Sequence, residues 1–164
     1  MISSLEKKAV RVGRREVKEK NHDSGTYILL INLPQTQKIK PGNLPEADYS
    51  KGIYLYVGRA MRGLRARIKR HIRKQKKLHW HIDYLLQKAK IEDIWIRPHF
   101  FAECSTAALI RNSNPSPKVP QEGFGSSDCR CSSHLFYFPP GTTGLNSLIK
   151  KLGFTKVDPN ENHS

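Results

Sequence analysis

Two short apolar runs, rich in β-branched and aromatic residues, alternate with polar segments in the first third of the chain. The first run is residues 27–33 (YILLINL), which Pro34 ends, and the second is residues 52–58 (GIYLYVG), which glycines bound. Runs of this length and composition are typical of buried β-strands. The intervening segment, to about Ser50, is rich in Gln, Lys, Pro and Gly and is expected to be a loop.

Helical spacing begins after the second run. Met61, Leu64, Ile68 and Ile72 recur at steps of three and four, which predicts a helix with one apolar face. The remaining predicted elements are a helix over about 81–90, a strand over 93–101, a short helix over 103–111 that a Pro-rich stretch ends, a strand over 135–138 and a helical turn over 145–152. The order β-β-α-α-β-α-β predicts a small α/β (α+β) domain, with a few-stranded mixed or antiparallel sheet flanked by helices.

The length of 164 residues suits one domain, which composition divides into three parts. Residues 1–23 carry seven Lys and Arg residues and few apolar ones, so we expect a flexible basic arm. Residues 24–140 would form the folded domain, and residues 141–164 a C-terminal helical turn with a frayed tail. The longest aliphatic run, 28–31, is far too short to cross a bilayer. An odd count of three cysteines, with no secretory segment, predicts a cytoplasmic protein without a disulfide framework.

Charge changes the picture most. The formal net charge is +15 and the isoelectric point is about 10.0, which favours a polyanionic partner and above all nucleic acid. Ten basic residues and no acidic one lie between Arg59 and Lys77. An ordinary solvated helix mixes the two signs, whereas this segment repels itself unless a polyanion supplies the opposite charge. The predicted binding residues are Arg59, Arg62, Lys69, Arg70, Arg73 and Lys74.

One row of this basic helix is expected at the margin of the core. At about 100° per residue, Arg67, His71 and Lys74 lie beside the apolar stripe of the helix. Packing would then hold these side chains in place, and a guanidinium so held offers forked donors that match phosphate oxygens. Arg67 is therefore the predicted phosphate-binding residue.

Several motifs resemble the GIY-YIG nuclease superfamily. Gly25, Thr26 and Tyr27 open one predicted strand, Tyr56, Val57 and Gly58 close the next, and Arg67 follows within RIKRH. The literal GIY at 52–54 is not the matching triplet, because it shares a strand with the second motif. The strings HWHIDYLL (79–86) and GFGSSDCRC (123–131) resemble one prokaryotic branch, classed as a domain of unknown function and sometimes fused to DNA-repair enzymes. The resemblance covers about residues 25–138 and implies that the loop after Pro34 contains an inserted strand pair.

The resemblance implies metal-dependent hydrolysis of a phosphodiester. Arg67 would neutralise charge on the phosphate, Tyr27 would orient or deprotonate the attacking water, and Tyr56 would help to fix water and phosphate. His71, and His79 or His81, would position or relay protons. A carboxylate would hold one Mg²⁺ or Mn²⁺, with Glu103 as the first candidate and Asp83 and Asp128 as alternatives.

The cysteines raise a separate question of zinc. Cys129, Cys131 and His134 lie close in sequence, and Cys104 or His81 could complete four ligands. Structural zinc sites usually combine two C-x₂₋₄-C-type pairs, so the spacing argues against zinc. The favoured interpretation is that Cys129 and Cys131 lie in a loop as buried free thiols.

These observations lead to one expected function and one alternative. The expected function is metal-dependent endonuclease cleavage in the repair or processing of structured DNA, by a monomer that works with a DNA-repair protein. The alternative is a catalytically silent module of the same fold that binds DNA or RNA. The sequence leaves open the choice of DNA or RNA, the substrate structure, the cut site and the pathway.

Overall fold

A five-stranded antiparallel sheet organises the chain, and the computed structural model describes residues 23–159. The strands run in the order β6-β4-β1-β5-β7. Their bounds are β1 Gly25–Leu33, β4 Gly52–Ala60, β5 Lys90–Pro98, β6 Leu135–Phe138 and β7 Thr155–Val157. A separate two-stranded sheet pairs β2 (Gln37–Ile39) with β3 (Ala47–Tyr49). The α+β class with an antiparallel sheet confirms the prediction.

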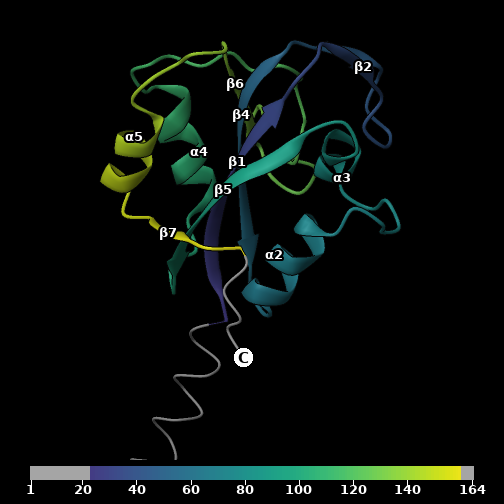
Figure 1. Ribbon diagram of the computed structural model, residues 1–164. Coiled ribbons are helices and arrows are strands. Elements are labelled where there is room, and N and C mark those ends of the chain that lie inside the picture. Colours follow the sequence, from purple (N-terminus) through teal and green to yellow (C-terminus); the bar gives the residue numbers. More distant parts are fainter. Residues whose placement is uncertain (1–22, 160–164) are drawn as a thin grey trace, which may run out of the picture.

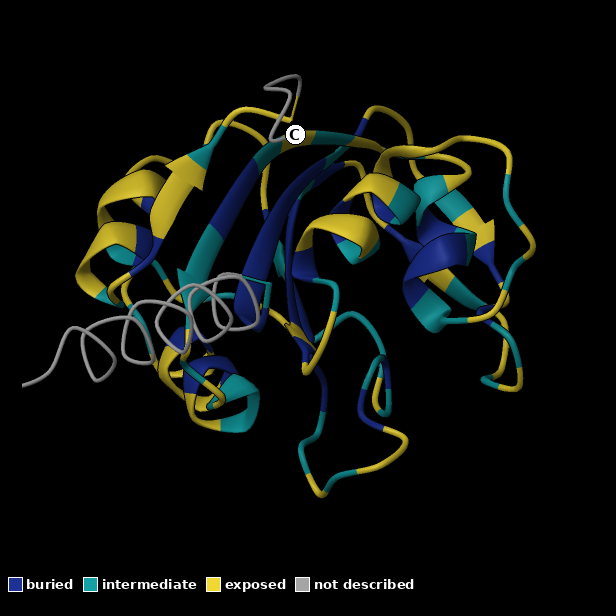
Figure 2. Ribbon diagram, turned by 90° about the horizontal axis from the view of Figure 1, so that it is seen from below, coloured by how far each residue is buried: buried dark blue, intermediate teal, exposed yellow. Residues whose placement is uncertain are grey.

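Helices cover both faces of the sheet (Figure 1). The helices α2 (Leu64–Ile72) and α3 (His81–Leu86) lie on one side, and α4 (Glu103–Arg111) and α5 (Leu145–Lys151) lie on the other. In the view from below, the central strands are buried, and the outward faces of the helices are exposed (Figure 2). The arrangement is therefore three layers, with the sheet in the middle.

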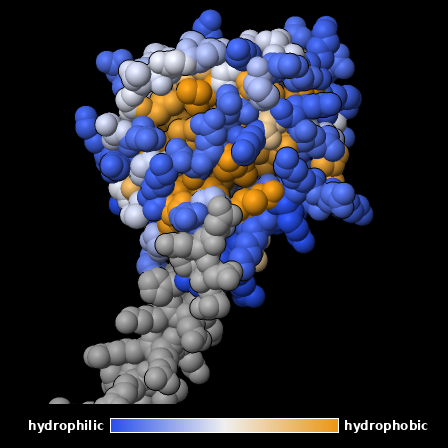
Figure 3. Space-filling view, in the orientation of Figure 1, coloured by the Kyte–Doolittle hydropathy of each residue, from blue (hydrophilic) through white to orange (hydrophobic). Residues whose placement is uncertain are grey.

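The alternation of side chains along β1 explains the two hydrophobic cores. Successive strand residues point to opposite faces, so Tyr27, Leu29 and Ile31 join the core beneath α2 and α3. Ile28 and Leu30 join the core beneath α4 and α5. As the central strand, β1 is almost entirely buried, which is why its sequence is a continuous apolar run. Around these cores, hydrophilic residues form much of the surface, with hydrophobic ones showing between them (Figure 3).

Several predicted boundaries were wrong. The first helix begins at Leu64, because Gly63 adopts φ 65° and the Leu64 N–H bonds to the Asp23 carbonyl at 2.8 Å. Met61, predicted on the apolar face, is 61% exposed. Ile72, which the spacing predicted to be buried, is also exposed, and His71 is buried in its stead.

The differences elsewhere follow from strand pairing. The helix predicted to reach residue 90 ends at Leu86, because Lys90 already begins β5 and pairs with Asn32. The strand predicted over 93–101 accordingly lies at 90–98. The predicted loop before Ser50 contains the β2–β3 hairpin, so the inserted strand pair that the resemblance implied is present. The strand β7 was not predicted.

The expected arm, residues 1–23, lies almost wholly outside the described residues. Within residues 23–159, no helix combines the length and apolar character needed to cross a membrane.

Candidate functional site

The two tyrosine motifs meet on adjacent strands. β1 and β4 pair antiparallel, with Tyr27 opposite Gly58 and Leu29 opposite Tyr56. A Cβ atom at Gly58 would lie 2.3 Å from the Tyr27 ring and hydroxyl, so only glycine leaves room for this ring. The Tyr27 and Tyr56 rings lie side by side, with centroids 6.4 Å apart. Gly58 of the second motif therefore leaves the space that the Tyr27 side chain of the first motif occupies.

A pocket of about 550 Å³ opens over these tyrosines. Nine candidate residues from the sequence line it: Tyr27, Tyr56, Arg59, Arg62, Arg67, His79, His81, Glu103 and Asp128. The walls come from β1, β4, α2, the start of α3, the start of α4 and the loop before β6, which are far apart in the sequence. Convergence of tyrosines, cations and a carboxylate in one cleft marks this pocket as the candidate site.

His71 lies behind Tyr27, and the two side chains share a hydrogen bond. The Tyr27 hydroxyl is 2.7 Å from His71 Nε2, and both residues are buried. Burial, assisted by the nearby Lys76 ammonium, lowers the pKa of His71 to about 3. Burial also raises the pKa of Tyr27 well above its usual range, an effect that Tyr56 increases and Arg67 opposes. At neutral pH the pair is therefore a neutral phenol beside a neutral imidazole.

Arg67 is held at the edge of the core, as its position on the helix predicted. Its guanidinium donates to the Arg59 carbonyl and lies 4.9 Å from the centroid of the Trp80 ring. Arg67 and Tyr27 line the same pocket, where the charge of Arg67 opposes the rise in the pKa of Tyr27. A guanidinium stacked on an indole keeps its donors in a fixed direction.

Glu103 connects the pocket to the loop before β6. One carboxylate oxygen lies 3.6 Å from Arg59 Nε, and the other lies 3.8 Å from His134 Nδ1. The Glu103 side chain is 17% exposed, and its residue begins α4. Asp128, the second carboxylate that the sequence suggested, also lines the pocket and is exposed.

The third carboxylate, Asp83, has a structural role instead. It is fully buried, and it accepts hydrogen bonds from Arg70 at 2.8 and 2.9 Å and from the backbone N–H groups of His79 and Trp80. Burial alone would raise the pKa of Asp83, but these hydrogen bonds bring it below its usual value. Asp83 thereby fixes the start of α3 and occupies Arg70, one of the predicted binding residues.

The other predicted binding residues lie outside the pocket. Lys69, Arg73 and Lys74 are exposed on α2 and just beyond its end. Arg70 is partly buried against Asp83, and its guanidinium lies 4.3 Å from the centroid of the Trp80 ring. The structure therefore separates pocket cations from cations on the surrounding surface.

Sequence reasoning missed the contributions of Trp80 and Gly125 to the pocket. Trp80 aligns Arg67, and Gly125 donates its N–H to His81 Nδ1 at 2.9 Å. Gly125 adopts φ +70°, and a Cβ atom there would approach the Tyr56 ring to 3.0 Å. The HWH and GFGSS strings contain Trp80 and Gly125 and were the available signals. The contacts of these residues depend on packing between distant segments.

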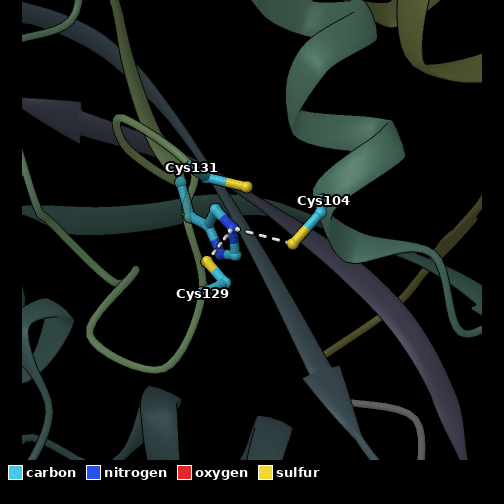
Figure 4. Close-up of side chains that lie close together, drawn as sticks. Cys104, Cys129 and Cys131 are labelled. Carbon is cyan, nitrogen blue, oxygen red and sulfur yellow. Dashed lines mark hydrogen bonds between the residues drawn. The ribbon is translucent and has the colours of Figure 1, made fainter.

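A second cluster lies next to this pocket. Cys104, Cys129, Cys131 and His134 gather between the first turn of α4 and the segment that leads into β6. The three cysteines are free and half-buried, and His134 is buried. Figure 4 shows the three labelled sulfur atoms turned toward one another, and two of them contact His134 Nε2.

Comparison with known proteins relates the chain to one family. The family model described as "Domain of unknown function DUF123" matches residues 26–154, which include the whole pocket and the cysteine cluster. No curated protein and no solved structure matches the chain.

Proposed function

This chain belongs to the DUF123 family, and we propose that it is a metal-dependent endonuclease of the GIY-YIG type. Its substrate would be nucleic acid, with DNA favoured and with repair or processing of structured DNA as the setting. One observation carries the proposal: Tyr27, Tyr56, Arg67 and Glu103 line a single pocket, in a chain whose net charge is +15. Phosphodiester hydrolysis needs a cation at the phosphate, a positioned water and an oxygen ligand for a metal, and the pocket holds candidates for each.

Arg67 binds the scissile phosphate in this proposal. Trp80 and the Arg59 carbonyl restrain its side chain, so little conformational entropy is lost when phosphate binds. Arg59 and Arg62 line the same pocket and add positive charge around the phosphate. Lys69, Arg73 and Lys74 contact the backbone farther along the nucleic acid.

Tyr27 positions the attacking water. With a pKa of about 3, His71 is neutral near pH 7, and in the tautomer with its proton on Nδ1 it accepts a hydrogen bond from the Tyr27 hydroxyl at Nε2. The phenol oxygen then keeps lone pairs that accept a hydrogen bond from water in the pocket. Because its pKa is raised, Tyr27 orients water in the resting site rather than deprotonating it. Tyr56 and His81 line the same pocket and would bind the water or the leaving oxygen.

A divalent metal fits the carboxylates of the pocket. Mg²⁺ prefers oxygen ligands, keeps several waters and is commonly held by one or two carboxylates. Glu103 and Asp128 provide such oxygens, whereas Asp83 is engaged with Arg70. When bound, the ion would stabilise negative charge on the leaving oxygen.

A catalytically silent binding module is the second candidate. The observation in its favour is that both Glu103 oxygens already face basic groups, Arg59 at 3.6 Å and His134 at 3.8 Å. A carboxylate whose charge is already balanced by basic groups gains less from binding a metal ion. The same cationic pocket would then bind phosphate without cleaving it.

Nicking assays with the full chain distinguish the two candidates. Wild-type protein is incubated with supercoiled plasmid and with branched, flapped and abasic duplexes, in Mg²⁺ or Mn²⁺ and in excess chelator. We expect metal-dependent nicking that falls about 100-fold or more in Arg67→Ala, while DNA binding persists. Arg65→Ala removes the same charge from the same helix at an exposed position and should lose far less activity.

The outcomes separate the proposals clearly. Binding without nicking on every DNA would exclude the DNA endonuclease, and nicking confined to RNA would reassign the substrate. Equal losses in Arg67→Ala and Arg65→Ala would show that general charge, rather than a phosphate site, drives the effect.

A further inference from the structure

Four side chains with metal-binding atoms converge beside the pocket. The ligand atoms of Cys104, Cys129, Cys131 and His134 all lie within 4.8 Å of one another. Cys104 stands in the first turn of α4, and the other three belong to the segment that leads into β6. We propose that these four residues bind one Zn²⁺ as a structural Cys₃His site. This proposal is independent of nuclease activity.

The spacings within the cluster match a tetrahedral zinc site. Zn–S bonds of about 2.3 Å and Zn–N bonds of about 2.0–2.1 Å, at tetrahedral angles, place sulfur about 3.6 Å from nitrogen. His134 Nε2 lies 3.5 Å from Cys129 Sγ and 3.8 Å from Cys104 Sγ. These two sulfur–nitrogen distances fit a tetrahedral ion, and Cys131 Sγ, which lies within 4.8 Å of the other ligand atoms, would move closer when the ion binds.

Hydrogen bonding alone explains the cluster less well. The Cys129 thiol donates weakly to the Ser126 carbonyl at 3.8 Å, yet the sulfur atoms of Cys104 and Cys129 both approach His134 Nε2, which has at most one proton to donate. A cation among the sulfurs and this nitrogen would satisfy all of them together. Three thiols around one imidazole would otherwise be a concentration of weakly bonded polar groups in a partly buried place.

The surroundings of His134 also suit a zinc ligand. Its other ring nitrogen, Nδ1, faces Glu103 Oε2 at 3.8 Å. Zinc-bound histidines usually direct their second nitrogen toward a carboxylate or a carbonyl, which fixes the tautomer and the ring orientation. The imidazole is 2% exposed, so its position is set by packing.

The number and burial of the ligands favour a structural role. Four protein ligands complete a tetrahedral shell and leave no position for water or substrate. Zinc would join the start of α4 to the segment before β6, whose chain supplies Gly125, Ser127 and Asp128 to the pocket wall. The sequence spacing disfavoured zinc because Cys129, Cys131 and His134 do not form two ordinary ligand pairs; the structure brings Cys104, one of the two possible fourth ligands, from α4 to join them.

Metal analysis of the full chain tests the site directly. Protein is purified without chelators and with reduced thiols, and its zinc is measured by mass spectrometry; we expect about one zinc per chain. Titrating the thiols of the folded wild type with an organomercurial should release this zinc to a chromogenic chelator. Replacement by Co²⁺ should give sulfur-to-cobalt charge-transfer absorption and the visible bands of a tetrahedral ion.

Variants identify the ligands. Cys104→Ala and Cys131→Ala should lose most of the zinc, and Cys104→His, which restores a fourth ligand, should recover it. His81→Ala is the matched control, because His81 contacts the same loop through Gly125 but lies outside the proposed ligand set. Circular dichroism of each variant checks folding. Absence of zinc with no tetrahedral cobalt spectrum, a disulfide among the cysteines, iron with sulfide in place of zinc, or unchanged zinc in Cys104→Ala would each overturn the proposal.

Discussion

At the scale of single residues, the hydrogen-bonded pair of Tyr27 and His71 gives the most direct test of the proposed chemistry. Tyr27→Phe removes one hydroxyl, keeps the ring over Gly58 and leaves His71 Nε2 without this partner. We expect cleavage to fall about 100-fold or more, because the water loses its orienting group, while DNA affinity is retained. Stability should fall by about 1 kcal/mol from the lost hydrogen bond. Single-turnover cleavage, DNA binding and urea unfolding measure the three effects.

Tyr54→Phe is the control for this change. Tyr54 is also a buried tyrosine on β4, but its hydroxyl donates to the Ser50 carbonyl at 2.6 Å, away from the pocket. It should lose similar stability and keep cleavage. Equal loss of cleavage in both variants would assign the effect to stability and argue against a role for the Tyr27 hydroxyl.

His71 predicts a pH dependence of stability. Its pKa is about 3 in the folded chain and about 6.5 when unfolded, so the unfolded state binds more protons between these values. The free energy of unfolding therefore falls as pH drops below about 6.5, by at most about 1.4 kcal/mol per pH unit from this residue, and is insensitive to it above. Burial lowers the pKa of His81 as well, and this residue contributes with the same sign.

His71→Gln tests this assignment, because glutamine can bond to Tyr27 but cannot titrate. Urea unfolding at several values between about pH 4.5 and 7.5 should show a shallower slope than in the wild type. Tyr54→Phe, which removes a buried hydroxyl that does not titrate in this range, should keep the wild-type slope. An unchanged slope in His71→Gln would show that other groups dominate the acid sensitivity.

Sequence reasoning pointed to residues of the candidate site where a motif or the helical spacing singled them out. Tyr27 and Arg67 could be predicted because their sequence surroundings are distinctive and their elements are regular. The joining of Cys104 to Cys129 and His134 depends on how α4 packs against a distant loop, which no local pattern reports. The stacking of Arg67 on Trp80 is hidden for the same reason.

At the scale of elements, a buried ion pair connects α2 to α3. The carboxylate of Asp83 accepts hydrogen bonds from Arg70 of α2 and from two backbone N–H groups at the start of its own helix. Asp83→Asn would leave the guanidinium of Arg70 without its counter-charge. We expect a loss of about 3–5 kcal/mol in the free energy of unfolding, measured by urea denaturation.

An exposed pair gives the matched comparison. Asp48 of β3 lies 3.8 Å from Lys38 of β2, and both side chains are at least 70% exposed. Asp48→Asn should change stability by less than about 0.5 kcal/mol, because water already screens the two charges. A similar small loss in Asp83→Asn would mean that the start of α3 does not depend on this carboxylate.

The elements differ in how far the sequence predicts them. The long strands β1 and β4 were evident, because a central sheet strand is apolar throughout and glycine or proline marks its ends. The three-residue strands β2, β3 and β7 contain too few residues for a pattern and exist through their pairing partners. The buried face of α2 was also misjudged at one position, since His71 rather than Ile72 completes it.

At the scale of the whole molecule, the positive charge on one side of the sheet is expected to bind the nucleic acid. The pocket lies with α2 and α3, whereas α5 lies on the other side and carries exposed lysines of its own (Figure 1). Each cation that neutralises a DNA phosphate releases counterions, which makes affinity depend on salt. The net charge of +15 alone would predict this dependence for any face.

Measuring the salt slope residue by residue locates the binding face. In a plot of log affinity against log salt concentration, the slope is negative. Arg62→Ala should make it less steep by about 0.9, the value for one lost phosphate contact with duplex DNA. Lys150→Ala on α5 removes the same charge from the opposite side and should leave the slope unchanged. Equal reductions would show that DNA senses total charge rather than this pocket. A reduction in Lys150→Ala alone would move the binding surface to α5 and separate it from Tyr27 and Arg67.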